Sequence, residues 1–211
     1  MYKKRSLFIT FEGIEGSGKS YQSKKLYKKI KKTKLPVIFT REPGGSKESE
    51  SIRKVLLSGT KNKFNKVTDA LLYLASRSEH IEKTLQPAIK KNKNIICDRF
   101  TDSMIAYQVY GNKIDRNLIN FVHKTILRKI KPDLTFILKV NLNKAMKRIK
   151  KRKNNNRYDN FSKPFYNKVQ NAFLKIAKTN KKKYFVINNT KDTIKTEQFI
   201  FSKFIEKLKN D

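Results

Sequence analysis

The segment from Gly13 to Ser20 has the residue types and spacing of a phosphate-binding loop. It matches the pattern G-x-x-x-x-G-K-[ST] at every fixed position and follows a short apolar run. In this pattern small residues let successive backbone N–H groups turn toward one anion, the lysine reaches the terminal phosphates, and the last hydroxyl can ligate Mg²⁺. We therefore expect a nucleotide's phosphates to be held by Gly13, Ile14, Glu15, Gly16, Ser17, Gly18, Lys19 and Ser20, with Ser20 also a metal ligand.

A carboxylate and a guanidinium follow a second apolar run, Ile95-Ile96-Cys97. Asp98 resembles the second carboxylate that P-loop proteins place near magnesium, although a strand-end aspartate can also cap the next helix. Arg99 offers a planar fork that matches phosphate oxygens. It indicates a second phosphate site, which favours phosphoryl transfer over hydrolysis.

The elements that must position these residues alternate along the chain. Helical periodicity separates five runs that we expect to be strands: Leu7–Phe11, Val37–Thr40, Asn94–Cys97, Leu134–Val140 and Tyr184–Ile187. Continuous apolar strands joined by helices predict a three-layer α/β fold, with a five-stranded parallel sheet flanked by helices. Because ligands gather at the carboxyl ends of such strands, the phosphate loop, residues 40–45 and Asp98-Arg99 should meet at one edge.

Three further segments have predicted structures. A long helix is expected over residues 66–91, bent near Pro87, and another over about 161–178. Residues 147–160 are rich in Lys, Arg and Asn, which fits a solvated linker or a mobile cationic lid over triphosphate. Residues 193–208 should form an amphipathic helix with a buried stripe of Ile194, Phe201, Phe204, Ile205 and Leu208, leaving Phe199 and Ile200 outside it.

Composition limits the classes of function. The 211 residues suit one domain, residues 1–211, and carry a formal net charge of +34. Because Lys is spread over the whole chain, the charge indicates general affinity for polyanions and no specific nucleic-acid site. The single cysteine, Cys97, lies within an apolar run and should be buried, which fits a reducing, cytoplasmic location, and no apolar segment approaches the roughly 18 residues that span a membrane.

Four segments together resemble one family. FEGIEGSGKS, TREPGG, LLYLASRSEH and DRFTDSMIAYQ occur in the order and approximate spacing of thymidylate (dTMP) kinases. The resemblance covers most of the chain. It implies transfer of a phosphoryl group from ATP to dTMP with Mg²⁺, and a homodimer built from long helices that include the one carrying Tyr73.

The resemblance also implies roles in the acceptor site. Tyr73 matches the aromatic residue that stacks on thymine, and Arg77, one helical turn later, matches an arginine that helps hold the base and phosphate. A purely structural interpretation would instead bury Tyr73 and leave Arg77 in solvent. The other implied contacts are Arg99 at the acceptor phosphate, Glu15 near the 3′-hydroxyl, Arg41 and Pro43 in one wall, Ser103 and Gln108 at the thymine edge, and Tyr107 against the sugar.

One more cation is expected at the transition state, because catalysis of phosphoryl transfer depends on positioning and charge neutralisation. The phosphate loop has no arginine between its glycines, so the chain resembles the branch of the family that supplies arginines from the lid. Arg152 and Arg157 are the candidates, and Arg148 remains an alternative.

The sequence therefore predicts a kinase that converts dTMP to dTDP. A kinase for another nucleotide or nucleoside and, less favoured, a nucleic-acid-binding P-loop protein or an inactive scaffold remain alternatives.

Overall fold

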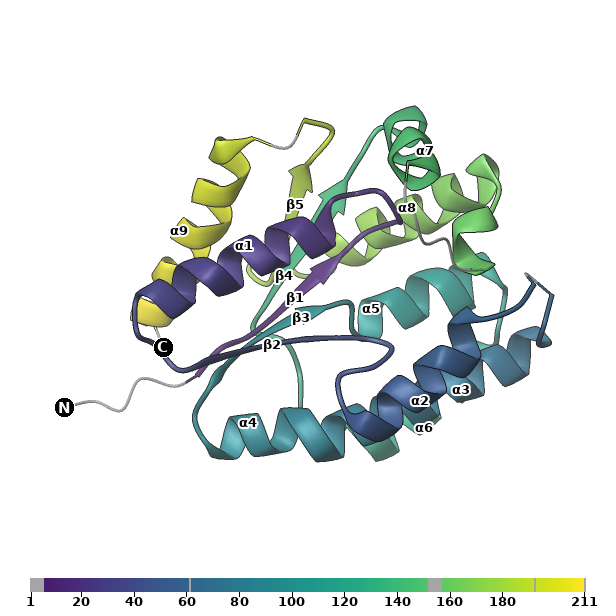
Figure 1. Ribbon diagram of the computed structural model, residues 1–211, viewed down its shortest axis with the longest axis horizontal. Coiled ribbons are helices and arrows are strands. Elements are labelled where there is room, and N and C mark those ends of the chain that lie inside the picture. The colour runs from purple at the N-terminus through teal and green to yellow at the C-terminus, as the bar shows by residue number, and fades with distance from the viewer. Residues whose placement is uncertain (1–5, 61, 152–156, 192, 211) are drawn as a thin grey trace.

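The computed structural model describes residues 6–60, 62–151, 157–191 and 193–210. Parallel strands form one five-stranded sheet in the order β2-β3-β1-β4-β5 (Figure 1). The bounds are Phe8–Glu12 (β1), Val37–Arg41 (β2), Asn94–Asp98 (β3), Leu134–Lys139 (β4) and Tyr184–Asn188 (β5). Each end lies within one residue of the predicted run, so the predicted parallel sheet is confirmed.

The register of the sheet brings the functional strand ends together. Phe11 of β1 pairs with Asp98 of β3 on one side and with Phe136 of β4 on the other. All five side chains of β1 and of β3 are buried, as expected for strands covered on both faces. The phosphate loop after β1 and Arg99 after β3 therefore leave the sheet at the same edge.

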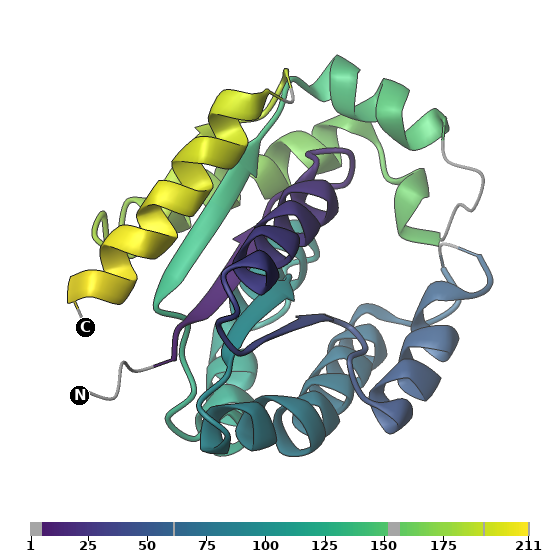
Figure 2. The same ribbon diagram turned by 60° about the vertical axis from the view of Figure 1, so that its left-hand side comes forward.

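Helices cover both faces of the sheet and complete three layers (Figure 2). On one face, Leu26 and Ile30 of α1 and Phe204 of α9 pack with Ile9 and Phe11 of β1. The opposite face is covered by the segments around α4, α5 and α8. The helical bounds are Lys19–Lys32 (α1), Lys47–Leu57 (α2), Lys66–His80 (α3), Gln86–Lys90 (α4), Thr101–Met104 (α5), Arg116–Leu127 (α6), Leu142–Lys150 (α7), Lys163–Ala177 (α8) and Ile194–Asn210 (α9).

The predicted helix over residues 66–91 is present as three consecutive helical segments. A π-helical turn, Ile81–Leu85, joins α3 to α4, and Pro87 lies in the first turn of α4. A proline has no N–H to donate, so an interrupted hydrogen-bond pattern just before it is expected. A second π-helical segment, Ile105–Gly111, continues α5 and buries Tyr107 and Gln108.

The buried stripe predicted for α9 is partly wrong. Ile200 is 1% exposed and packs in the core, whereas Ile194 is 73% exposed. Ile200, Phe204 and Leu208 are spaced by four residues, so they form one face that lies against the sheet. Ile194 is the first residue of the helix and lies off this face.

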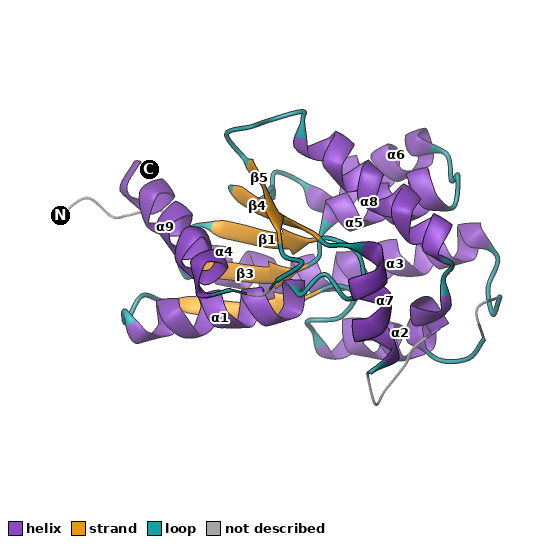
Figure 3. Ribbon diagram, turned by 90° about the horizontal axis from the view of Figure 1, so that it is seen from above, coloured by secondary structure: helices purple, strands orange, loops and turns teal. Residues whose placement is uncertain are grey.

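The segment predicted as a lid has described residues on both sides of 152–156. Helix α7 ends at Lys150, and a 3₁₀ turn, Arg157–Asn160, leads into α8. Figure 3 shows α2, α3 and α7 at the end of the sheet toward which the strands point. Within the described part of the chain, no helix has the length and apolar character that crossing a membrane requires.

Candidate active site

The loop between β1 and α1 has the backbone of a phosphate cradle. Gly13, Gly16 and Gly18 all have positive φ angles, of 139°, 73° and 90°. A Cβ on Gly13 or Gly16 would lie 2.6 Å from a backbone oxygen of a neighbouring segment, so a larger residue does not fit either position. Lys19 lies over the loop and is 6% exposed, with its ammonium donating to the Ile14 carbonyl at 3.3 Å.

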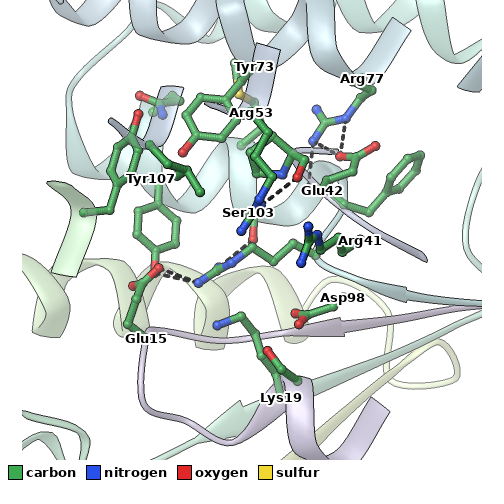
Figure 4. A pocket seen from close by; sticks show the side chains of 18 residues that line it. Glu15, Lys19, Arg41, Glu42, Arg53, Tyr73, Arg77, Asp98, Ser103 and Tyr107 are labelled. Carbon is green, nitrogen blue, oxygen red and sulfur yellow. Dashed lines mark hydrogen bonds and ion pairs between the residues drawn. The ribbon is translucent and has the colours of Figure 1, made fainter. Parts of the chain in front are cut away.

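The residues beside the loop fit a magnesium ion held jointly with phosphates. Asp98 is 8% exposed, and its Oδ1 is buried with no hydrogen-bond partner among the described residues. Lys19, Ser20 and Asp98 line the same pocket, and Lys19 and Asp98 point into one part of it (Figure 4). A carboxylate and a hydroxyl are oxygen ligands that suit Mg²⁺, which takes its remaining ligands from phosphate and water. In the described ranges, no group of three or more His, Cys, Asp or Glu side chains is arranged to hold a metal ion.

The pocket extends from the phosphate loop to α3 and to the π-helical segment after α5. Its wall combines basic, acidic and aromatic side chains, and the two ends of the pocket differ in chemistry. The phosphate end includes Lys19, Asp98 and Arg99, and the aromatic end includes Tyr73, Met104, Tyr107, Gln108 and Tyr158. One cavity can therefore hold an anionic group next to the loop and a planar group farther away.

Arg99 is fixed at the phosphate end by ionic contacts. Its guanidinium donates to the Gly13 carbonyl at 3.0 Å and to Glu15 Oε1 at 2.6 Å. Burial alone would lower the pKa of Arg99, but the neighbouring Tyr107, Glu15 and Asp98 raise it. For the acidic Glu15, burial alone would raise the pKa, but Arg99 and Lys19 hold it below its usual value. Both groups therefore stay ionised.

Tyr107 and Glu15 form a second contact in the same cluster. The Tyr107 hydroxyl donates to Glu15 Oε2, and the Arg99 guanidinium lies over the Tyr107 ring at 5.1 Å. Burial raises the pKa of Tyr107 well above its usual value, so the hydroxyl keeps its proton. The predicted neighbours Glu15, Arg99 and Tyr107 are thus brought together, from the phosphate loop, the end of β3 and the segment after α5.

Ser103 has partners other than the thymine edge expected for it. Its hydroxyl donates to Glu12 Oε2 at 2.5 Å and accepts from Arg99 Nη1 at 3.0 Å. Glu12 is fully buried and also accepts from the Phe100 N–H at 2.7 Å. Burial and the nearby Asp102 raise the pKa of Glu12 to about 8. Ser103 thus links Glu12 to Arg99 and supports the arginine. Sequence spacing alone does not reveal this link.

Arg77 lines the pocket and is buried, which contradicts the purely structural interpretation that left it in solvent. Its side chain is 3% exposed, and its Nε and Nη2 donate to Glu42 Oε2 at 2.8 and 2.6 Å. Nη1 meets His123 Nε2 at 2.6 Å, and His80 Nδ1 lies 3.0 Å from Glu42 Oε1. Burial and the charge of Arg77 lower the pKa of His123 to about 3, so that imidazole is neutral and accepts. Arg77 therefore lines the pocket as part of a buried ionic network.

The wall after β2 contains an arginine that sequence reasoning missed. Arg53 of α2 lines the pocket and donates from Nη1 to the Pro43 carbonyl at 2.7 Å. Arg41 also lines the pocket, with its guanidinium paired to Glu50 at 3.0 Å. Glu50 and Arg53 lie one helical turn apart just after TREPGG, and that spacing is the signal that could have identified Arg53.

The aromatic end contains the two residues expected at the base. Tyr73 and Gln108 both line the pocket, and Gln108 Oε1 accepts from Asn112 at 2.7 Å. The Tyr73 ring lies 5.8 Å from the ring of Tyr158, which sequence reasoning did not place in the site. Tyr158 follows an asparagine-rich segment, and nothing in that composition points to a pocket residue.

The structure corrects the expectation for Arg157. Its side chain is 1% exposed and its guanidinium binds Asp69 of α3, so it is not directed to the phosphate loop. Arg148 is the candidate that reaches the loop, donating to the Gly16 carbonyl at 3.0 Å. Arg152 lies outside the described residues.

Comparison with known proteins gives consistent results. The family model "Thymidylate kinase" matches residues 11–200. The chain is 43% identical over 173 residues to the thymidylate kinase of Wolbachia pipientis wMel, covering 81% of this chain and 85% of that one. It is 36% identical over 207 residues to that of Mycoplasma capricolum, covering 97% of each. It is also similar to the crystal structure of thymidylate kinase from Ehrlichia chaffeensis, with a TM-score of 0.73 and 34% identity over 96% of this chain and 98% of that one.

Proposed function

The chain belongs to the thymidylate kinase family, and from this premise we propose which of its residues carry out each part of the reaction. The enzyme phosphorylates dTMP to dTDP with ATP as donor and Mg²⁺, a step in the synthesis of dTTP. One observation supports the assignment most: the phosphate end of a single pocket contains both the phosphate-loop lysine, Lys19, and the guanidinium of Arg99. Two phosphate-binding groups on one wall suit a donor and an acceptor that meet there.

The donor side is assigned to residues Gly13–Ser20. The N–H groups of the loop and Lys19 would bind the β- and γ-phosphates of ATP, aided by the positive end of α1. Ser20 and the unpartnered oxygen of Asp98 would hold Mg²⁺, which when bound neutralises charge that develops on the phosphates. Arg148 would fix the loop through the Gly16 carbonyl.

The acceptor side is assigned to the rest of the pocket. Arg99 would bind the phosphate of dTMP and align it with the donor, while Glu15 and Tyr107 would contact the sugar. Tyr73 would stack on thymine and Gln108 would bind its edge. Arg77, held in place by Glu42, would line the base site. Arg41, Pro43 and Ser103 would shape the wall and support Arg99.

No general base is needed, because the attacking phosphate is already an anion at neutral pH. The contribution of the protein is to hold two anions in line and to neutralise the charge that spreads over the transferred group. Arg152, with Arg148 as the alternative, keeps the role of additional cation, because the loop itself supplies no arginine and Arg157 is committed to Asp69.

We also propose a single domain that acts as a homodimer in the cytoplasm. Helices α3 and α6 pack side by side, and their outer surfaces expose Val67, Leu71 and Phe121, with exposed fractions of 48%, 47% and 72%. Apolar side chains grouped on neighbouring helices suit contact with a second copy. Light scattering of the wild type and of Phe121→Asp tests this: a dimer that becomes a monomer in the variant supports it, and a monomeric wild type rejects it.

A coupled assay of ADP formation across dTMP, dUMP, dCMP and dGMP tests the substrate. We expect the highest kcat/KM with dTMP. Fastest turnover of anything but a thymine or uracil deoxynucleotide would reject the assignment, and Lys19→Ala should abolish turnover with the true substrate.

A further inference from the structure

A buried ionic cluster lies at the aromatic end of the pocket. We call it the Arg157 clasp and define it as Arg157, Asp69 and Tyr158, whose exposed fractions are 3%, 7% and 7%. The Arg157 guanidinium donates to Asp69 Oδ1, to the Leu56 carbonyl and, at 2.6 Å, to the Tyr158 hydroxyl. Tyr158 donates to Asp69 Oδ2 at 3.0 Å. The clasp therefore ties the turn before α8 to α2 and α3.

The clasp also fixes the orientation of the Tyr158 ring. The backbone carbonyl of Tyr158 accepts from the Tyr166 hydroxyl of α8 at 2.8 Å, so the residue is held at both its main chain and its side-chain tip. Its ring lies 5.8 Å from the Tyr73 ring, with 59° between the ring planes, and both rings line the pocket. Burial raises the pKa of Tyr158, so the hydroxyl stays a donor to Asp69.

The burial of the ion pair decides between two roles for Arg157. Moving Arg157 to a phosphate would leave Asp69 as a buried, unpaired carboxylate, which is strongly unfavourable. Asp69 and Arg157 are 88 residues apart in the chain, so their contact joins segments that no local structure holds together. A guanidinium used in this way positions its neighbours and is not available at the transition state.

We propose that the Arg157 clasp is a positioning device for nucleobase recognition, and that Tyr158 forms a second aromatic wall of the base site, next to Tyr73. The inference rests on the proposed acceptor site. It assigns Arg157 to base binding through Tyr158 and removes it from phosphoryl-transfer catalysis. Because the two rings are set at an angle, a planar base that stacks on Tyr73 would meet Tyr158 edge-on. Aromatic groups favour both stacked and edge-on contacts.

Steady-state kinetics of the full-length enzyme with Tyr158→Leu, Tyr158→Phe and Asp69→Asn test the inference. For Tyr158→Leu we expect KM for dTMP to rise about tenfold, with kcat within about threefold of the wild type and KM for ATP within about twofold. Tyr158→Phe keeps the ring and should change KM for dTMP less than Tyr158→Leu does. Asp69→Asn should raise KM for dTMP and lower Tm, and Glu82→Gln, which breaks the exposed pair with Arg128, should do neither.

Competitive inhibition by 2-deoxyribose 5-phosphate separates base recognition from general damage. This ligand has the phosphate and sugar but no base, so its inhibition constant should not change in Tyr158→Leu. A parallel weakening of both ligands, or an equal rise in KM for ATP, would overturn the inference.

Arg157→Met gives a second, independent decision. A fall in kcat of a hundredfold or more with unchanged KM for dTMP would identify a transition-state cation and contradict the clasp. Wild-type turnover of dTMP in the same assay tests the proposed function separately, since the clasp can fail while that activity stands. If Asp69→Asn does not fold, Tyr158→Leu and Tyr158→Phe still decide the question.

Discussion

The buried pair of Arg77 and Glu42 should make a large and pH-dependent contribution to stability. Both side chains are at most 5% exposed, and two hydrogen bonds of 2.6 and 2.8 Å join them. Arg77→Met removes one partner of this pair and leaves a buried carboxylate, which costs about 3–5 kcal/mol of unfolding free energy. For a chain of this length the cost corresponds to a fall in Tm of about 10 °C.

The pH dependence follows from Glu42. Burial tends to raise the pKa of Glu42, and Arg77 is the main group that holds it below its usual value. Without Arg77 the folded-state pKa should rise above the unfolded value, so the folded variant binds a proton where the unfolded chain does not. Its deficit in stability should therefore be largest at neutral pH and shrink as pH falls toward 5.

Urea unfolding followed by circular dichroism measures these quantities. The double variant Glu42→Gln/Arg77→Met removes both charges and should recover at least about 2 kcal/mol relative to the sum of the single changes. A cost below about 1 kcal/mol for Arg77→Met, or additive single changes, would show that the ionic network does not hold the wall of the pocket.

Three further substitutions test other parts of the site. Tyr107→Phe removes the hydroxyl that donates to Glu15 at the proposed sugar site, where Tyr107 would disfavour a ribose 2′-hydroxyl. The preference in kcat/KM for dTMP over ribothymidine monophosphate should therefore fall about tenfold, and an unchanged preference would separate Tyr107 from the sugar. His123 has a folded pKa of about 3 against 6.5 for the free side chain, so the wild type should lose stability as pH falls through this range. Thermal unfolding of His123→Gln, which keeps an acceptor near Arg77, should depend less on pH there, and parallel curves would contradict the assignment. The folded pKa of Glu12 is about 8 against 4.5, so stability should fall as pH rises from about 4.5 to 8, and Glu12→Gln should flatten the Tm profile over that range.

The sequence predicted the sheet well because its evidence is local. Continuous apolar runs such as Leu134–Leu138 can only be buried strands in this alternation, and the phosphate loop fixes where β1 ends. The stripe of α9 was assigned wrongly at Ile194 because helical spacing does not say where the buried face starts. That face depends on how the helix meets the sheet.

Motif spacing brought several predicted site residues to one pocket, but it gave few of their partners. Tyr73, Gln108 and Arg99 all line the pocket, as motif spacing indicated. The roles of Arg77 and Ser103 depend on carboxylates 35 and 91 residues away, and a single sequence holds no signal for such pairs.

Tyr158 and Arg53 were missed for a related reason. Tyr158 reaches the pocket from a segment that carries no recognised motif, and Arg53 does so from the helix after TREPGG, where only its spacing from Glu50 marks it. The packing of α2, α3 and α8 brings both to the pocket. Long-range ionic contacts hold these segments together. Such contacts depend on the folded arrangement and cannot be predicted from composition or local sequence.

A single inhibitor tests the central claim, that ATP and dTMP bind head to head in one pocket. In this inhibitor, adenosine and thymidine are joined 5′ to 5′ by a chain of five phosphates. The chain is long enough for the inhibitor to occupy both sites at once. We expect the inhibitor to compete with both ATP and dTMP and to lose affinity in Lys19→Ala and in Arg99→Met. Competition against ATP alone, with dTMP still binding freely, would contradict it.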